Sequence, residues 1–123
     1  EGQMREESVL SRQALEAIRE MAGSEEVFGE LIEMFVADSQ ERLAAIERAL
    51  VEQDAEALGS AAHALKGSCA NFGAAHLEEL CRQLQEMGYG GDMEGARALL
   101  PQVRLELERL HAALARELGS RDA

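Results

Sequence analysis

Residues 93–118 read MEGARALLPQVRLELERLHAALAREL, and this stretch has the most regular apolar spacing in the chain. Apolar side chains recur there every three or four residues: Ala96, Leu100, Val103, Leu107, Leu110, Leu114 and Leu118. That spacing places them on one narrow face of an α-helix, the kind of seam that packs in a helical bundle. Pro101 lacks an N–H and clashes with the carbonyl four residues back, so we expect a kink or split near Leu100.

Four segments before this stretch also have helical periodicity. They cover residues 11–22, 25–53, 55–72 and 75–87, and the breaks between segments are Gly23-Ser24, Asp54, Gly73 and the run Gly88 to Gly91. Glycine commonly ends helices, while serine and aspartate cap their N-termini. The sequence therefore predicts an all-α fold, an antiparallel four-helix bundle with a short additional N-terminal helix covering one end. Residues 11–119 form the predicted domain, and residues 1–10 are expected to be a disordered or tag-like N-terminal segment.

The composition excludes several classes of function. The 123 residues include 24 acidic and 12 basic ones, for a formal net charge of −12. Nucleic-acid phosphates and anionic membrane surfaces repel such a chain, and no apolar run approaches the roughly 20 residues that span a bilayer. Cys69 and Cys81 lack metal-type spacing and are typical of buried thiols in a reducing compartment. We expect a cytoplasmic protein that neither binds nucleic acid nor inserts into a membrane.

The segment at residues 55–72 contains the candidate chemistry. Its predicted buried stripe consists of Leu58, Ala62, Leu65, Cys69 and Phe72, which fall near one line at about 100° per residue. His63 lies about 140° from that line and should face solvent. The outer half of the helix around it holds five small residues: Gly59, Ser60, Ala64, Gly67 and Ala70. Two glycines inside a helix each cost roughly 1 kcal/mol relative to alanine, so the bare surface suits close approach by another protein.

Lys66, the single lysine of the chain, follows His63 by three residues and is its neighbour on the helix. Phosphoryl transfer needs a nucleophile in line and positive charge on the phosphoryl oxygens, and histidine serves as a covalent carrier in such reactions. The pattern therefore indicates a phosphoryl carrier. The alternative is an ordinary exposed histidine, with the two glycines explained by close packing against the first helix.

Residues 63–74, HALKGSCANFGA, resemble the signature of histidine-containing phosphotransfer (HPt) domains of bacterial phosphorelays. The family pattern is His-x-Leu-Lys-Gly-Ser, with Gly-Ala a few residues later, and the layout from about Phe28 to Leu118 is also similar. Cys69 stands where the family often has serine, on the predicted core stripe. The chemotaxis-kinase type of phosphotransfer domain, which a kinase domain of the same protein phosphorylates, has a similar motif and stays an alternative.

The resemblance implies a phosphocarrier in a two-component phosphorelay. In it, His63 would accept and donate the phosphoryl group, Lys66 would stabilise that group, and Gly67 would leave room for the partner. From the helical spacing alone, Gly59, Ser60, Ala64 and Ala70 complete the predicted partner surface. The implied partners are response-regulator receiver domains, which supply the aspartate and the Mg²⁺, and a histidine kinase in the same or another chain is a further candidate.

The remaining signals assign no second function. The chain has no Gly-rich phosphate loop followed by Lys-Ser/Thr, so we expect no nucleotide site, no cofactor and no enzyme activity of its own. His76 and Glu79 show the reverse of the Glu-x-x-His order that metal-binding bundles use, and show it once, so no metal site is predicted. We expect a monomer. The competing hypothesis is a structural helical-bundle interaction module without phosphotransfer, although Lys66 and Gly67 favour the carrier.

Overall fold

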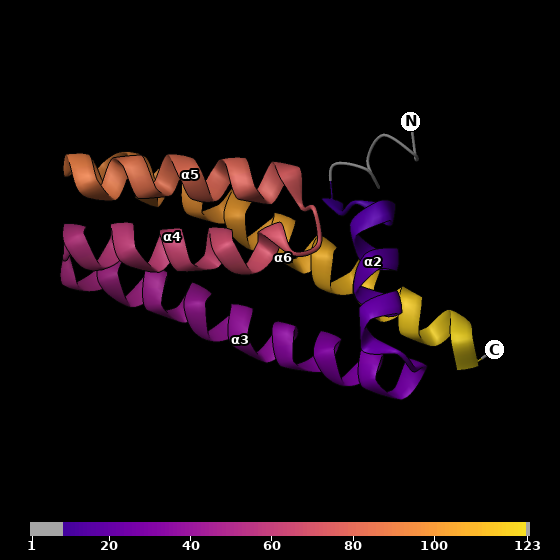
Figure 1. The fold of residues 1–123 in the computed structure, drawn as a ribbon. Helices are drawn as coiled ribbons and strands as arrows, with labels where there is room; N and C mark the ends of the chain where they lie inside the picture. The colour runs from indigo at the N-terminus through magenta and orange to yellow at the C-terminus, as the bar shows by residue number, and fades with distance from the viewer. Residues whose placement is uncertain (1–8, 123) are drawn as a thin grey trace.

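The computed structural model describes residues 9–122, and it confirms the predicted bundle. The helices are α2 (Arg12–Ala22), α3 (Glu25–Glu52), α4 (Ala55–Ala70), α5 (Ala75–Gly90) and α6 (Met93–Asp122). The four long helices lie side by side, whereas α2 runs across one end of them (Figure 1). Helix α3 packs on α4, α4 on α5, and α5 on α6, and α6 closes the bundle against α3.

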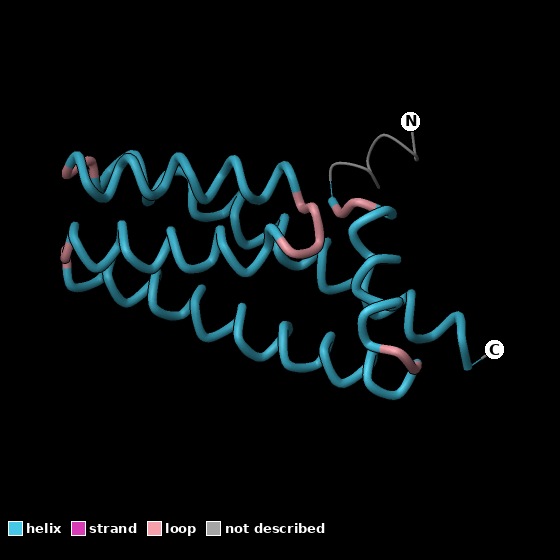
Figure 2. The backbone as a smooth tube through the Cα atoms, in the orientation of Figure 1, coloured by secondary structure: helices cyan, strands magenta, loops and turns pink. Residues whose placement is uncertain are grey.

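Short loops connect the helices (Figure 2), and side chains cap the N-termini of α2, α3 and α4. The side chain of Ser24 accepts a hydrogen bond from the Val27 N–H at the start of α3, and Asp54 does the same for the Ala57 N–H at the start of α4. The loop between α3 and α4 is only Gln53 and Asp54, so these two helices must run antiparallel. The predicted caps at Ser24 and Asp54 are therefore confirmed.

Two helices differ most from the prediction, α5 at its end and α6 at Pro101. Helix α5 continues through Gly88, Tyr89 and Gly90, and only Gly91, with φ of 80°, ends it. Gly88 stays helical because it lies against α4, where its missing side chain permits close contact. Helix α6 runs without interruption through Pro101, so the predicted split is wrong. Pro101 is exposed, and water can reach the carbonyl that loses its N–H partner there.

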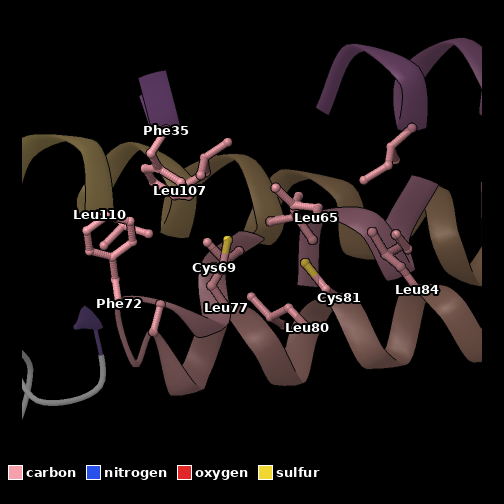
Figure 3. Packing of buried hydrophobic residues seen from close by; sticks show 14 of the residues in the cluster. Phe35, Leu65, Cys69, Phe72, Leu77, Leu80, Cys81, Leu84, Leu107 and Leu110 are labelled. Atoms are coloured by element: carbon pink, nitrogen blue, oxygen red, sulfur yellow. The ribbon is translucent and has the colours of Figure 1, made fainter. Parts of the chain in front are cut away.

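One hydrophobic core fills the space between the helices. The predicted stripe of α4 is confirmed, because Leu58, Ala62, Leu65 and Cys69 are fully buried and Phe72 is nearly so. The Phe72 ring packs on Phe35 of α3 with ring centroids 4.6 Å apart. Figure 3 shows Cys69 and Cys81 within this core. Both are free thiols, and burial raises the pKa of Cys81 to about 12, which keeps that thiol protonated.

The domain begins earlier than the predicted boundary. Leu10, which the sequence analysis assigns to the N-terminal segment, is 1% exposed and belongs to the core. The Ser11 N–H donates a 2.8 Å hydrogen bond to the Phe72 carbonyl after α4, and the Ser11 hydroxyl caps α2. The rest of the segment for which disorder is predicted, residues 1–8, lies outside the described residues. Within residues 9–122, no helix is both long and apolar enough to cross a bilayer.

Candidate functional site

His63 lies in the middle of α4 with its side chain exposed, as the helical spacing predicts. Its ring has one protein partner in the described chain. The Nδ1 atom of His63 lies 3.3 Å from the amide oxygen Oε1 of Gln85 on α5. An amide oxygen only accepts hydrogen bonds, so this contact favours the tautomer that carries its proton on Nδ1. The lone pair of the neutral ring is then on Nε2, which is available to react.

Lys66 borders the site on the side of α5. Its side chain is half-buried, and no hydrogen bond or ion pair joins it to another residue of the described chain. Its charge acts on the Cys81 thiol of α5, where it lowers a pKa that burial chiefly raises. An ammonium group without a carboxylate partner keeps its charge available for an anion next to His63.

The two glycines of α4 have different surroundings. A Cβ added at Gly67 would meet no atom within 4 Å, so Gly67 is open to solvent. A Cβ added at Gly59 would lie 2.5 Å from a ring carbon of Tyr89, and one added at Gly88 would lie 2.5 Å from the Gly59 nitrogen. Gly59 is thus buried by α5, and its assignment to the partner surface is wrong. The neighbour that explains Gly59 is α5, whereas the sequence analysis considered packing against the first helix.

The other predicted surface residues remain beside His63. Ser60 and Ala70 are exposed on α4, and Ala64 is half-buried toward α3. Together with Gly67 they leave a stretch of helix next to His63 without long side chains. We call these four residues the small-residue face. The structure brings His63, Lys66 and the small-residue face together, and it adds Gln85, which the sequence analysis did not identify.

A polar connection between α3 and α4 lies one turn beyond His63. The Ser68 hydroxyl donates a 3.0 Å hydrogen bond to Oδ2 of Asp38 on α3. Arg42 of α3 donates from Nε to the same oxygen, also at 3.0 Å. This connection fixes α4 against α3 next to Gly67. It also brings a second positive charge to the edge of the small-residue face.

An apolar groove continues from this connection toward α2. It has a volume of about 690 Å³, and Asp38, Ser68 and Asn71 form its polar edge. Its other walls come from α2, α3 and the end of α4, and they are lined by Ala14, Ala17, Ile18, Met21, Leu31, Met34, Phe35 and Phe72. Met21 and Met34 are 79% and 66% exposed. Exposed apolar side chains gathered around a groove are typical of a protein-binding surface.

His76, on α5, has a protein partner of its own. His76 lies 3.4 Å from the carboxylate of Glu106, which is 3% exposed and also pairs with Arg109. His76 therefore has a partner other than Glu79, the residue that the sequence analysis considered. No group of three or more His, Cys, Asp or Glu side chains is arranged to hold a metal ion within the described residues.

Comparisons with known proteins agree on one family. The family model described as "Hpt domain" matches residues 30–113. A region of 59 residues is 36% identical to the "Phosphorelay intermediate protein YPD1" of Candida albicans; the match covers 48% of this chain and 32% of that protein, about a third of its length. The crystal structure of histidine-containing phosphotransfer protein B (HptB) from Pseudomonas aeruginosa PAO1 is similar with a TM-score of 0.83 and 32% identity. That similarity covers 90% of this chain and 95% of the solved one.

Proposed function

Because this chain belongs to the Hpt domain family, we propose that it is a phosphocarrier in a two-component phosphorelay, with His63 as the carrier residue. The observation that supports this most directly is the state of His63. Its ring is exposed, its Nδ1 atom is occupied by Gln85, and open space surrounds Gly67 one turn away. A nucleophile held in this way is prepared for a partner that brings a phosphoryl group.

The reaction would take place at Nε2. The Nε2 lone pair forms a bond to phosphorus while the bond from phosphorus to the aspartyl oxygen of the receiver breaks, and the aspartate leaves as a carboxylate. The imidazole keeps its Nδ1 proton and becomes positively charged as the new bond forms. The Gln85 oxygen, 3.3 Å from Nδ1, stabilises that charge. Return of the phosphoryl group to a receiver follows the same steps in reverse.

Lys66 would stabilise the phosphoryl oxygens. Its ammonium group has no carboxylate partner in the described chain and lies three residues after His63 on the same helix. The other positive charge for the reaction would come from Mg²⁺ bound to the receiver. No cofactor of this chain's own is part of the proposal, and no step requires a nucleotide.

The receiver would dock over the small-residue face and the groove. The groove offers apolar surface from Met21 and Met34, and its polar edge at Ser68 adjoins Gly67. A receiver placed there covers Gly67 and brings its aspartate to His63. We expect the carrier to act as a monomer in the cytoplasm, and a histidine kinase in the same or another chain would supply the phosphoryl group to the relay.

The test is direct transfer of label. A receiver domain is phosphorylated with labelled acetyl phosphate, freed of reagent and mixed with this protein. We expect label that is lost in acid and retained in base, as for a phosphoramidate, and none on the His63→Gln variant. ATP and Mg²⁺ alone should give no label. If receivers bind but never transfer label to the wild type, the structural interaction module becomes the better hypothesis.

A further inference from the structure

Arg42 of this acidic domain pairs with a carboxylate and still has a free cationic edge. It is held to Asp38 through Nε alone, and neither of its terminal nitrogens is hydrogen-bonded within residues 9–122. Arg82, Arg97 and Arg109, in contrast, use a terminal nitrogen to bind Glu86, the Leu50 carbonyl and Glu106. Arg104 binds Glu47 through Nε in the same way as Arg42 binds Asp38, but it lies on α6. The Arg42 side chain is 41% exposed. The edge of the guanidinium that carries the two terminal nitrogens is therefore oriented by Asp38 and open to solvent.

The pairing of α3 with α4 places Arg42 beside the small-residue face. Phe35 packs on Phe72, and Asp38 binds Ser68. The helices are antiparallel, so one turn forward on α3, from Asp38 to Arg42, corresponds to one turn back on α4, from Ser68 to Ala64. Ala64 is the residue next to His63 and belongs to the small-residue face. Arg42 thus borders this face from α3, while Lys66 borders it from the side of α5.

Asp38 holds the guanidinium in place because its own position is fixed from both helices. Oδ2 of Asp38 accepts hydrogen bonds from Arg42 of α3 and from Ser68 of α4. A guanidinium fixed through Nε loses less side-chain freedom when its outer nitrogens bind an anion. The net charge of −12 makes such a fixed cation useful, because the domain as a whole repels an acidic partner.

We propose that Arg42 is a receiver-binding residue whose terminal nitrogens form an ion pair with a carboxylate on the surface of the docked receiver. The proposal rests on the proposed function, which supplies the partner. The receiver presents carboxylates near the contact, since its acceptor is an aspartate and the Mg²⁺ that it holds requires oxygen ligands. Arg42 lies between the groove and His63, so this ion pair fixes the orientation of the receiver between its apolar contact and the reacting aspartate.

The experiment measures binding apart from transfer. Affinity for an unphosphorylated receiver is measured by calorimetry in the His63→Gln background, at two salt concentrations. Arg42→Ala should raise Kd about tenfold and reduce its dependence on salt. Arg42→Lys keeps the positive charge but lacks the planar guanidinium. Its Kd should therefore lie between the values for the wild type and for Arg42→Ala. The matched control is Arg48→Ala, because Arg48 is exposed on the same helix, about 240° further round, and has no ion pair within the described residues.

Two outcomes would overturn the proposal. One is equal Kd values for the Arg42→Ala and Arg48→Ala proteins. The other is a weakened binding of Arg42→Ala that comes with a lower melting temperature and no change in salt dependence, which would make Arg42 a structural residue. Label transfer to the protein with native His63 is measured separately. Absence of label there would reject the phosphocarrier, whereas the binding data alone decide the role of Arg42.

Discussion

The amide oxygen of Gln85 lies 3.3 Å from Nδ1 of His63, so a residue of α5 favours the tautomer of an α4 histidine in which Nε2 is free. The bond crosses between two helices that pack closely along their length. An imidazole without this contact would exchange between two tautomers and rotate in solvent. The contact therefore links the geometry of the bundle to the chemistry of His63.

Replacing Gln85 should change transfer without changing the fold. Gln85→Leu removes the acceptor, and we expect transfer to slow by about tenfold with a loss of tautomer preference in the ¹⁵N NMR spectrum of His63. Gln85→Glu places a carboxylate at Nδ1 and favours the protonated ring, which has no free lone pair, so its transfer should shift to higher pH. The control is Gln83→Leu, since Gln83 binds Glu79 at 3.2 Å instead. Transfer by Gln85→Leu that equals the control would contradict the role.

Lys66→Ala should slow transfer and leave the melting temperature almost unchanged. The ammonium group has no partner in the described chain, so its loss breaks no ion pair there and removes only positive charge next to the phosphoryl group. Lys66→Arg should restore part of the rate. The measurement is the single-turnover rate at saturating receiver, where weaker binding has no influence. A rate for Lys66→Ala equal to wild type would show that the charge acts elsewhere.

The two glycines of α4 should separate function from packing. Gly67→Gln fills open space on the helix, so stability should hold or rise by up to roughly 1 kcal/mol while transfer falls strongly. Gly59→Ala would place a Cβ 2.5 Å from the Tyr89 ring, and because Tyr89 is 58% exposed its ring can turn outward, so we expect a loss of only about 1 kcal/mol. Urea unfolding and label transfer measured on both variants give the comparison. A stable Gly59→Ala protein that fails to bind receivers would return Gly59 to the partner surface.

The groove should contribute to receiver affinity. Met34 is 66% exposed on its wall, so Met34→Glu should weaken binding by about tenfold with little effect on stability. Val51→Glu is the matched control, because Val51 is 82% exposed on the same helix and lies outside the groove. Calorimetry with an unphosphorylated receiver gives both values. Equal affinities for the two variants would place the docking surface away from the groove.

His111 should make the fold less stable in mild acid. Its Nε2 atom lies 2.8 Å from the buried Ser39 hydroxyl, whose proton goes to the Val36 carbonyl, and burial lowers the pKa of His111. The unfolded chain then binds the proton more readily, so stability falls as pH drops below about 6.5. His111→Gln keeps a donor without titrating, and its melting temperature should fall less than wild type between about pH 7 and 5. If the melting temperatures of the two proteins fall equally as the pH drops, His111 does not cause the loss of stability.

The fold could be predicted from sequence because each helix has a clear apolar period and recognisable caps. The apolar stripe of α4 is the best case. All five of its members are buried as the helical spacing requires: Leu58, Ala62, Leu65, Cys69 and Phe72. The end of α5 could not be predicted in this way. Gly88 and Gly90 resemble a loop in sequence, and only the contact of Gly88 with α4 shows why the helix continues.

Part of the candidate site could be read from the sequence, for a similar reason. His63, Lys66 and Gly67 lie within one continuous motif, so their helical spacing could be read directly. Gln85 lies 22 residues from His63 in the sequence, and a single glutamine has no sequence pattern that indicates its partner. Gly59 was misassigned because a glycine in a helix looks the same whether it makes room for a neighbouring helix or for another protein.

The contact of Gly59 with Gly88 also limits how this motif can be transplanted. These glycines set the distance between α4 and α5, because any Cβ at Gly88 would lie 2.5 Å from the Gly59 nitrogen. Gln85 is three residues before Gly88 and His63 four after Gly59, so the same spacing determines whether their side chains meet. A protein engineer who grafts residues 63–68 onto another helical bundle would transfer the proposed carrier histidine and the lysine. The graft would present the correct nitrogen only if the host brings its second helix equally close.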